Sequence, residues 1–354
     1  MNKRRETAGA VIAGMLGLSI MSMLWPAAPT LAAPVLAWMA LGLLWRDIGI
    51  QQRAQAVIFC VVGIVALWWG SGRGAELHVE GILGQNQAIL SMLASITLLR
   101  LLPPPLREDE PELPRGAGTY VRSMLGVHAF GAAINISAVI IMADRLSRTA
   151  PLTLPQAQLL SRSFATVAFY SPFIGGVALG LAYTPGSNAL LMMLFGFQVA
   201  VAALLLLSWY ARTGRVHDIT NFRGYPMHLG GLWLPVMLAT AVLVASALTS
   251  AYSVLSLITM LTPVVVGSAL LMSGGFGLLR DSLSDYVSRR LPEMGGELAL
   301  FLAAGVMGSG LLAAVGAETS WIPFDHLDAF TASLMLLVFP LTSLTCPPWS
   351  CQFL

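Results

Sequence analysis

The stretch from Tyr120 to Ala143 reads YVRSMLGVHAFGAAINISAVIIMA and is long and apolar enough to enter a membrane. Gly126, Gly131 and the triplet Asn135-Ile136-Ser137 interrupt it near its middle. Non-helical backbone is tolerated at membrane depth only where it is buried in protein or lines a wet cavity. We therefore predict that residues 120–143 form a re-entrant hairpin, which enters the membrane and returns to the side from which it came.

The composition places the rest of the chain in the membrane as well. Of its 354 residues, 56% are hydrophobic and 10% are charged, and the mean hydropathy is +0.77. Soluble domains carry about 25% charged residues, so most of this surface must face lipid. We expect an all-α polytopic membrane protein with membrane lipid as a partner. The net charge of +2 is too small to indicate a nucleic-acid partner.

Apolar segments follow one another with short polar connections between them. A hydrocarbon core about 30 Å thick needs roughly 20 apolar residues per helix, so we predict about ten transmembrane helices plus the hairpin. The first, in residues 1–30, is too long for a secretion signal, and we expect it to stay as a helix. The apolar segments are 8–25, 31–45, 54–70, 82–102, 120–143, 163–183, 189–209, 229–248, 253–275, 297–315 and 329–345.

Basic residues set the orientation, because Lys and Arg accumulate in cytoplasmic loops. If every segment spans and the N-terminus is cytoplasmic, ten of the nineteen basic residues lie outside. If 120–143 returns as a hairpin, only Arg73 lies outside. Making 163–183 re-entrant leaves four basic residues outside, and making 82–102 re-entrant leaves five. The hairpin at 120–143 fits best, in a protein of the bacterial inner membrane with a cytoplasmic N-terminus.

The segments fall into two groups of opposite orientation. Residues 31–209 form a first predicted repeat, residues 210–228 a cytoplasmic loop, and residues 229–354 a second repeat. Inverted repeats with broken helices near the midplane are typical of secondary transporters. Because any polytopic chain can be divided into halves, the grouping alone leaves the repeat open.

Short motifs stand at distinct places in this layout. Asn135-Ile136-Ser137 lies in the hairpin, Ser171-Pro172-Phe173 followed by Gly175-Gly176 interrupts 163–183, and residues 301–308 lead to Gly316. Their order resembles the ion transporter superfamily, the divalent anion/sodium symporters, citrate carriers and arsenite-pump-like membrane proteins. The resemblance covers 31–345 in layout. It implies a hairpin tip at the first motif, a broken helix at the second, transport of a small solute, and a homodimer.

The chain departs from the family pattern in two ways. Its first tip reads Asn-Ile-Ser rather than an uninterrupted Ser-Asn-Thr, which leaves the identity of a bound ion open. A second group as long as the first would continue beyond Leu354. We therefore expect an incomplete second repeat, which ends near its hairpin tip at residues 341–345 and lacks the return arm, broken helix and last helix.

The breaks and the resemblance together indicate where solute binds. Helix N-termini suit carboxylates or oxyanions, and unwound carbonyls with Asn and Ser oxygens suit Na⁺. We expect Na⁺ as a coupling ion, no other metal and no organic cofactor. The alternative is that these polar side chains are interhelical hydrogen-bond partners. The predicted solute- and ion-binding residues are Asn135, Ser137, Ser171, Pro172, Gly175, Thr342, Ser343 and Thr345.

His128 is the ionisable side chain that lies most clearly inside an apolar segment. Such groups are functional candidates because burying a charge in the membrane is costly. We consider His128 a candidate proton carrier, and the alternative is a neutral imidazole held by a carbonyl. No Asp or Glu lies well within an apolar segment, which favours Na⁺ coupling or uncoupled transport over proton coupling.

Glycines cluster at two places in the second group. One cluster is Gly274, Gly275 and Gly277, and the other includes Gly305 and Gly310. Small residues let membrane helices approach each other closely. We interpret both clusters as packing surfaces between helices.

Two other function classes stay open beside a secondary transporter. A non-catalytic membrane subunit of a larger complex would bind no solute by itself. The one sequence signal for a membrane-embedded transferase or hydrolase is the pair His217-Asp218. The sequence holds no metal-spaced cluster, no Gly-x-Ser-x-Gly elbow and no phosphate loop, so we do not expect an enzyme.

Single cysteines at Asp144, Ser187 and His217, in a background without the native cysteines, test the predicted topology. We expect thiol reagents to label positions 144 and 217 from the cytoplasm and position 187 from outside. Labelling of position 144 from outside would mean that 120–143 spans the membrane, and the hairpin prediction would then be wrong.

Overall fold

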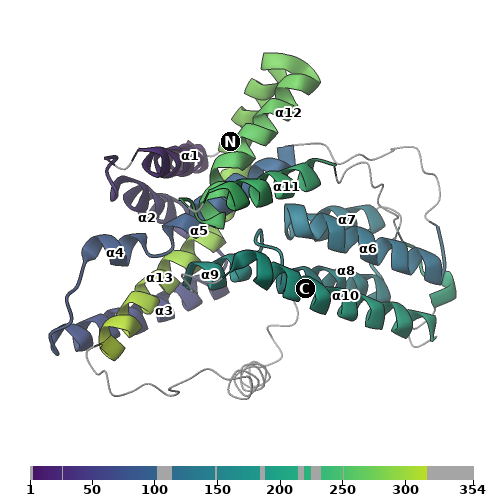
Figure 1. The fold of residues 1–354 in the computed structure, drawn as a ribbon, viewed down its shortest axis with the longest axis horizontal. Coiled ribbons are helices and arrows are strands. Elements are labelled where there is room, and N and C mark those ends of the chain that lie inside the picture. The colour runs from purple at the N-terminus through teal and green to yellow at the C-terminus, as the bar shows by residue number, and fades with distance from the viewer. Residues whose placement is uncertain are drawn as a thin grey trace.

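The computed structural model describes residues 3–25, 27–101, 114–147, 150–183, 188–213, 219–224, 233–249 and 251–316. All elements in these ranges are helical, apart from one isolated β-bridge between Arg115 and Arg223 (Figure 1). The α-helices are α1 (Lys3–Leu24), α2 (Ala32–Leu44), α3 (Ile50–Ser71), α4 (Val79–Gly84), α5 (Gln87–Thr97), α6 (Ala117–Ile134), α7 (Ser137–Ser147), α8 (Leu154–Ala165), α9 (Gly175–Tyr183), α10 (Ala189–Arg212), α11 (Trp233–Leu248), α12 (Val254–Asp285) and α13 (Gly295–Gly316). Shorter turns of helix are η1 (Trp45–Asp47), η2 (Leu98–Leu101), η3 (Thr166–Phe169), η4 (Ile219–Asn221), η6 (Tyr286–Arg290) and η7 (Leu291–Met294).

Five helical stretches in the described part of the chain are long and apolar enough to cross a membrane. This confirms the prediction of an all-α chain and indicates a protein embedded in the membrane. The expected number of about ten spanning helices and the inverted repeat stay predictions. The stretches are Lys3–Leu24, Ile50–Ser71, Val79–Leu101, Ala189–Arg212 and Val254–Gly316.

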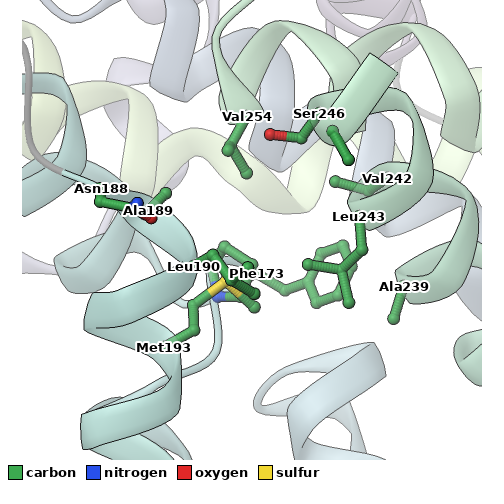
Figure 2. Close-up of a pocket in the computed structure, with 12 residues that line it drawn as sticks. Phe173, Asn188, Ala189, Leu190, Met193, Ala239, Val242, Leu243, Ser246 and Val254 are labelled. Atoms are coloured by element: carbon green, nitrogen blue, oxygen red, sulfur yellow. The ribbon is translucent and has the colours of Figure 1, made fainter. Parts of the chain in front are cut away.

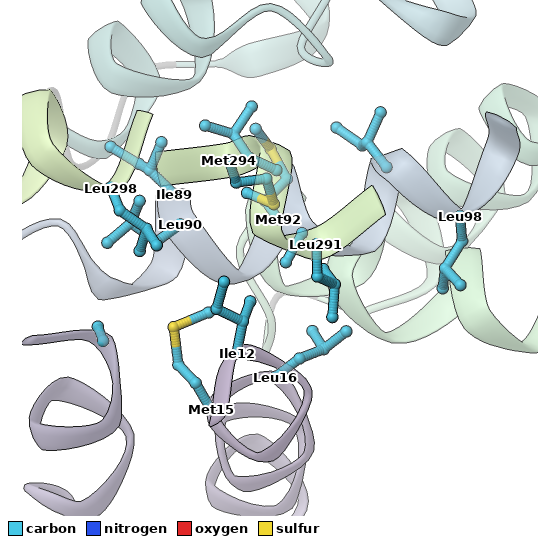
Figure 3. Close-up of a cluster of buried hydrophobic side chains, with 14 of the residues drawn as sticks. Ile12, Met15, Leu16, Ile89, Leu90, Met92, Leu98, Leu291, Met294 and Leu298 are labelled. Atoms are coloured by element: carbon cyan, nitrogen blue, oxygen red, sulfur yellow. The ribbon is translucent and has the colours of Figure 1, made fainter. Parts of the chain in front are cut away.

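A first hydrophobic cluster joins α1, α2 and α5 to helices from the C-terminal half of the described chain. Ile12 and Met15 of α1 are completely buried, as are Leu90 and Met92 of α5 and Leu291 of η7. Figure 3 shows these side chains converging between the helices. Lipid tails are as apolar as Leu, so burial alone drives little association between membrane helices. The packing instead gains stability from close dispersion contacts between these side chains.

Helices α3 and α13 pack backbone against backbone. A Cβ at Gly63 would lie 2.6 Å from the carbonyl oxygen of Val306, and one at Gly70 would lie 2.7 Å from that of Ala313. A Cβ at Gly310 would overlap the carbonyl oxygen of Gly63. The interpretation of Gly310 as a packing glycine therefore agrees with the structure, and Gly63 and Gly70 supply the matching surface.

Gly274 and Gly275 are a turn rather than a packing surface, so that interpretation was wrong for them. Gly275 has φ 69° and ψ −164°, and Gly274 has φ −153° and ψ 15°, both outside the helical region. A positive φ with an extended ψ is open essentially to glycine alone. The two residues divide α12 into two arms.

The two arms of α12 fold back toward each other. The Ser95 hydroxyl of α5 donates to the Thr259 carbonyl in the first arm, at 2.9 Å. The Tyr286 hydroxyl, just after the second arm, donates to the Ala94 carbonyl at 2.6 Å. A straight helix would separate Thr259 from Tyr286 by about 40 Å. Both ends of α12 therefore lie at the same level of α5.

A second hydrophobic cluster holds α6, α7, α8 and α10 together. In Figure 1 these four helices lie beside one another, in blue to teal. With η4 they form a unit whose core is separate from the first cluster. Its most buried members are Tyr120, Met124, Val127, Met142, Leu146, Leu159, Leu160 and Ala211.

Residues that precede and follow the predicted hairpin both bond the segment of Phe222 and Arg223, at one end of the second cluster. The Gly116 amide, just before α6, donates to the Phe222 carbonyl at 3.0 Å. The Gln156 side chain in α8 donates through Nε2 to the Arg223 carbonyl at 2.8 Å. A chain that crossed the membrane once between Gly116 and Gln156 would separate these groups. The arrangement agrees with a hairpin at 120–143, whose insertion from the cytoplasm stays a prediction.

Gly310→Ala tests the contact between α3 and α13. The new methyl group meets backbone that cannot swing aside, and overpacking of this kind costs about 1 to 3 kcal/mol. We expect a lower thermal unfolding midpoint in detergent, followed by circular dichroism. Gly17→Ala in α1 is the control, because a Cβ there meets nothing within 4 Å. Equal midpoints for Gly310→Ala and the parent would contradict the close packing.

Candidate functional site

The predicted hairpin turns at Asn135. Helix α6 ends at Ile134 and α7 begins at Ser137. Asn135 has φ 57°, and no other non-glycine residue in the described ranges has a positive φ. Its ψ of −147° places it in the same extended positive-φ region as Gly275, which non-glycine residues rarely adopt, and a bond from the Ile136 amide to Asn135 Oδ1 at 2.7 Å holds the turn. The sequence therefore located the interruption of this apolar segment correctly.

The predicted break in 163–183 is also present. Helix α8 and η3 end at Phe169, and α9 begins at Gly175, so residues 170–174 are not helical. Pro172 lies inside this gap and has no N–H to continue a helix. Ser171 is 1% exposed, and its Oγ accepts from the Phe173 amide at 3.3 Å. A polar side chain thus satisfies backbone that the break releases.

The hairpin turn and the broken segment contact each other. Asn135 Nδ2 donates to the Phe173 carbonyl at 3.4 Å. In the opposite direction, Ser171 Oγ donates to the Ala132 carbonyl near the end of α6 at 2.8 Å. Two groups predicted separately, Asn135 at the tip and Ser171 at the break, therefore lie together. The end of α6 leaves the Ala132 carbonyl free to accept from Ser171, and the break leaves the Phe173 carbonyl free to accept from Asn135.

A hydrogen-bonded chain runs through His128, about two helical turns before the tip at Asn135. Thr166 Oγ1 donates to the Ser163 carbonyl at 2.7 Å, so its oxygen is left to accept from His128 Nδ1, also at 2.7 Å. His128 Nε2 then accepts from the Tyr170 hydroxyl at 3.1 Å. This assignment of hydrogens, inferred from the network, describes a neutral imidazole. The hydroxyl groups of Thr166 and Tyr170 bond its two ring nitrogens, and its role as a proton carrier stays a prediction.

A cavity of about 300 Å³ lies beside the break (Figure 2). We call it the Phe173 cavity. Its walls come from the break, from the start of α10, from α11 and from the first residue of α12. Lining side chains include Pro172, Phe173, Leu190, Met193 and Leu243. Pro172, which the sequence singled out for its break, is therefore also a cavity residue.

Gly175 lies against the first hydrophobic cluster. A Cβ there would be 2.9 Å from Cζ of Phe301 in α13, whereas one at Gly176 would meet nothing within 4 Å. The close approach expected of this glycine pair therefore depends on Gly175 alone. It lets the start of α9 reach the first cluster while η3 packs on α10.

Several predicted site residues lie, wholly or in their side chains, outside the described part of the structure. Ser137 begins α7, but its side chain is outside the described part of the structure. Thr342, Ser343 and Thr345 also lie outside the described residues, as do His217 and Asp218. Their predicted roles stay predictions.

Among the buried polar residues that were not predicted from the sequence, Asn86 interrupts a predicted membrane segment. Asn86 divides the predicted segment 82–102 between α4 and α5 and is 2% exposed. Its Nδ2 donates to the Phe301 carbonyl at 2.8 Å, in the residue that also contacts Gly175. The run Gly84-Gln85-Asn86 within an apolar stretch was the available signal. In the lining of the Phe173 cavity, Leu243 and Met193 carried no such signal, because apolar residues in membrane helices are ordinary.

No group of three or more His, Cys, Asp or Glu side chains that could hold a metal occurs within the described ranges. No family model, curated protein or solved structure matches this chain. The resemblance to the ion transporter superfamily therefore rests on the motifs alone and stays a prediction. Function has to be argued from the geometry of the site.

Tyr170→Phe tests the His128 network. Loss of the hydroxyl leaves a buried imidazole nitrogen without its donor, which costs about 1 to 3 kcal/mol. We expect a lower thermal unfolding midpoint in detergent. Tyr210→Phe in α10 is the matched control, because the Tyr210 hydroxyl makes no hydrogen bond to the part of the chain that the structure describes. An equal change in both variants would contradict the network.

Proposed function

We propose that this chain is a secondary transporter that moves a small anionic solute across the bacterial inner membrane, with Na⁺ as the coupling ion. The observation that carries the proposal is the contact between the hairpin turn at Asn135 and the broken segment at Ser171 and Phe173. Interrupted helices that meet inside a membrane protein are the architecture in which transporters bind solutes and ions. Irregular backbone at that depth is otherwise costly.

The chemistry of this contact suits a small cation. The Phe173 carbonyl lies between η3 and α9 and accepts from Asn135 Nδ2 at 3.4 Å, which is long for a strong hydrogen bond. A carbonyl oxygen has two lone pairs and can also coordinate a hard ion such as Na⁺. The other end of that side-chain amide, Asn135 Oδ1, accepts from the Ile136 amide at 2.7 Å in the hairpin turn. Rotation of the Asn135 amide, with loss of the Ile136 bond, would turn Oδ1 toward the Phe173 carbonyl and offer both oxygens to one ion.

The division into two hydrophobic clusters supports movement between two bodies. The hairpin, α8 and α10 pack around one core, and α1, α2, α5, α12 and α13 pack around another. The broken segment links them, because Phe173 belongs to the first cluster while the preceding η3 packs with the second. Alternating access in such proteins is a rocking of one body against the other around the site.

Asn135→Gly tests the proposal in proteoliposomes that hold an inward Na⁺ gradient. Glycine keeps the positive φ but removes the amide, so we expect uptake of radiolabelled benzoate or succinate, whichever the parent moves, to fall at least about tenfold, the equivalent of one lost hydrogen bond. Ser137→Ala should have the same effect. Ser147→Ala, at the exposed end of α7, is the control.

Normal uptake by Asn135→Gly and Ser137→Ala would remove the hairpin site. If the parent transports neither probe with any ion gradient and is stable only with another subunit, the chain is a non-catalytic membrane subunit. Sodium-independent uptake by the parent would keep the transporter and remove the coupling ion.

A further inference from the structure

The Phe173 cavity has walls of apolar side chains. Ten of its twelve lining residues are Pro, Phe, Ala, Leu, Met or Val, and the other two are Asn188 and Ser246. None of these twelve carries a charge. Figure 2 shows Phe173 and Leu243 toward the middle of the site, with Asn188 and Ser246 at its margin.

A solute with two or three negative charges does not suit these walls. Each charge taken from water into apolar surroundings needs a counter-charge or several hydrogen bonds, and the twelve described lining residues include no Arg, Lys or His. An apolar group, by contrast, fills such a space without losing hydrogen bonds. The lining therefore selects for a ligand whose body is apolar and whose charge is at most one.

The margin of the cavity can hold one polar end. Asn188 Oδ1 is occupied by the Leu191 amide at 3.1 Å, which leaves the amide NH₂ as a donor. Ser246 supplies a hydroxyl from α11. The first residues of α10 and α12, Ala189 and Val254, also line the cavity, and backbone N–H groups in the first turn of a helix have no partner within the helix. These donors suit one carboxylate.

The size of the cavity limits the ligand further. About 300 Å³ is at the lower end of the range of small-molecule sites. A benzoate or a short fatty acid fits within this volume. The volume and the lining thus agree on one class of compound.

We propose that the Phe173 cavity binds a small monocarboxylate with an aromatic or short aliphatic body, and that this class is the transported solute. The inference rests on the proposed transport function and names its substrate class. A ligand that packs against the Phe173 side chain contacts the same residue whose carbonyl accepts from Asn135 Nδ2. Solute and ion sites are then coupled through a single residue of the broken segment.

Equilibrium binding of radiolabelled benzoate to the full chain tests the inference, in detergent and in lipid nanodiscs. We expect saturable binding in both that excess unlabelled butyrate displaces and excess succinate does not. Leu243→Trp fills the cavity, so benzoate loses its apolar contact with the walls. We expect the affinity for benzoate to fall at least about tenfold. Val244→Trp is the matched control, since Val244 is 51% exposed and is not a lining residue.

The outcomes separate the inference from the proposed function. Binding and uptake of succinate but not benzoate would overturn the substrate class and keep the transporter. Benzoate binding that Leu243→Trp weakens, without uptake of any probe in proteoliposomes, would keep the site and overturn the transporter. Benzoate binding that Leu243→Trp leaves unchanged would remove this cavity as its location. Binding in detergent that disappears in nanodiscs would assign the cavity to a lipid acyl chain.

Discussion

Inside a hydrocarbon core, a backbone N–H or C=O that leaves a helix has no water to bond, so each interruption of a membrane helix needs a partner from elsewhere in the protein. The described part of this chain meets that constraint at its broken segments. Ser171 bonds the Ala132 carbonyl, Asn135 bonds the Phe173 carbonyl, and Asn86 bonds the Phe301 carbonyl. The hairpin turn and the broken segment thus bond each other's backbone, and Asn86 ties its own interruption to α13.

The pairing of breaks also explains how the site relates to the two hydrophobic clusters. The hairpin is held in its own cluster by Met124, Met142 and Leu159, and its ends are held together through Phe222 and Arg223. Its tip, however, contacts a segment whose Phe173 belongs to the other cluster. A site built at such a junction changes shape when the two bodies move, which a site within one rigid core would not do.

Glycine shows how the same residue serves opposite purposes in membrane helices. At Gly63, Gly70 and Gly310 the absence of Cβ lets α3 and α13 approach to backbone contact. At Gly275 it permits a positive φ, and α12 turns back. Small size and conformational freedom are both properties of one residue type, so a glycine cluster in a sequence does not by itself distinguish a packing surface from a turn.

The sequence by itself determined the all-α membrane class and the positions of the breaks at Asn135 and Pro172. Composition acts over the whole chain, while the missing N–H of Pro and the bond from the Ile136 amide to the Asn135 side chain act within a few residues, so both can be read locally. Only the tertiary structure decided that Asn135 meets Phe173, that Gly275 is a turn, and that Leu243 of α11 completes a cavity at the break. These facts depend on contacts between residues distant in the chain, and an apolar residue that faces a cavity is the same in sequence as one that faces lipid.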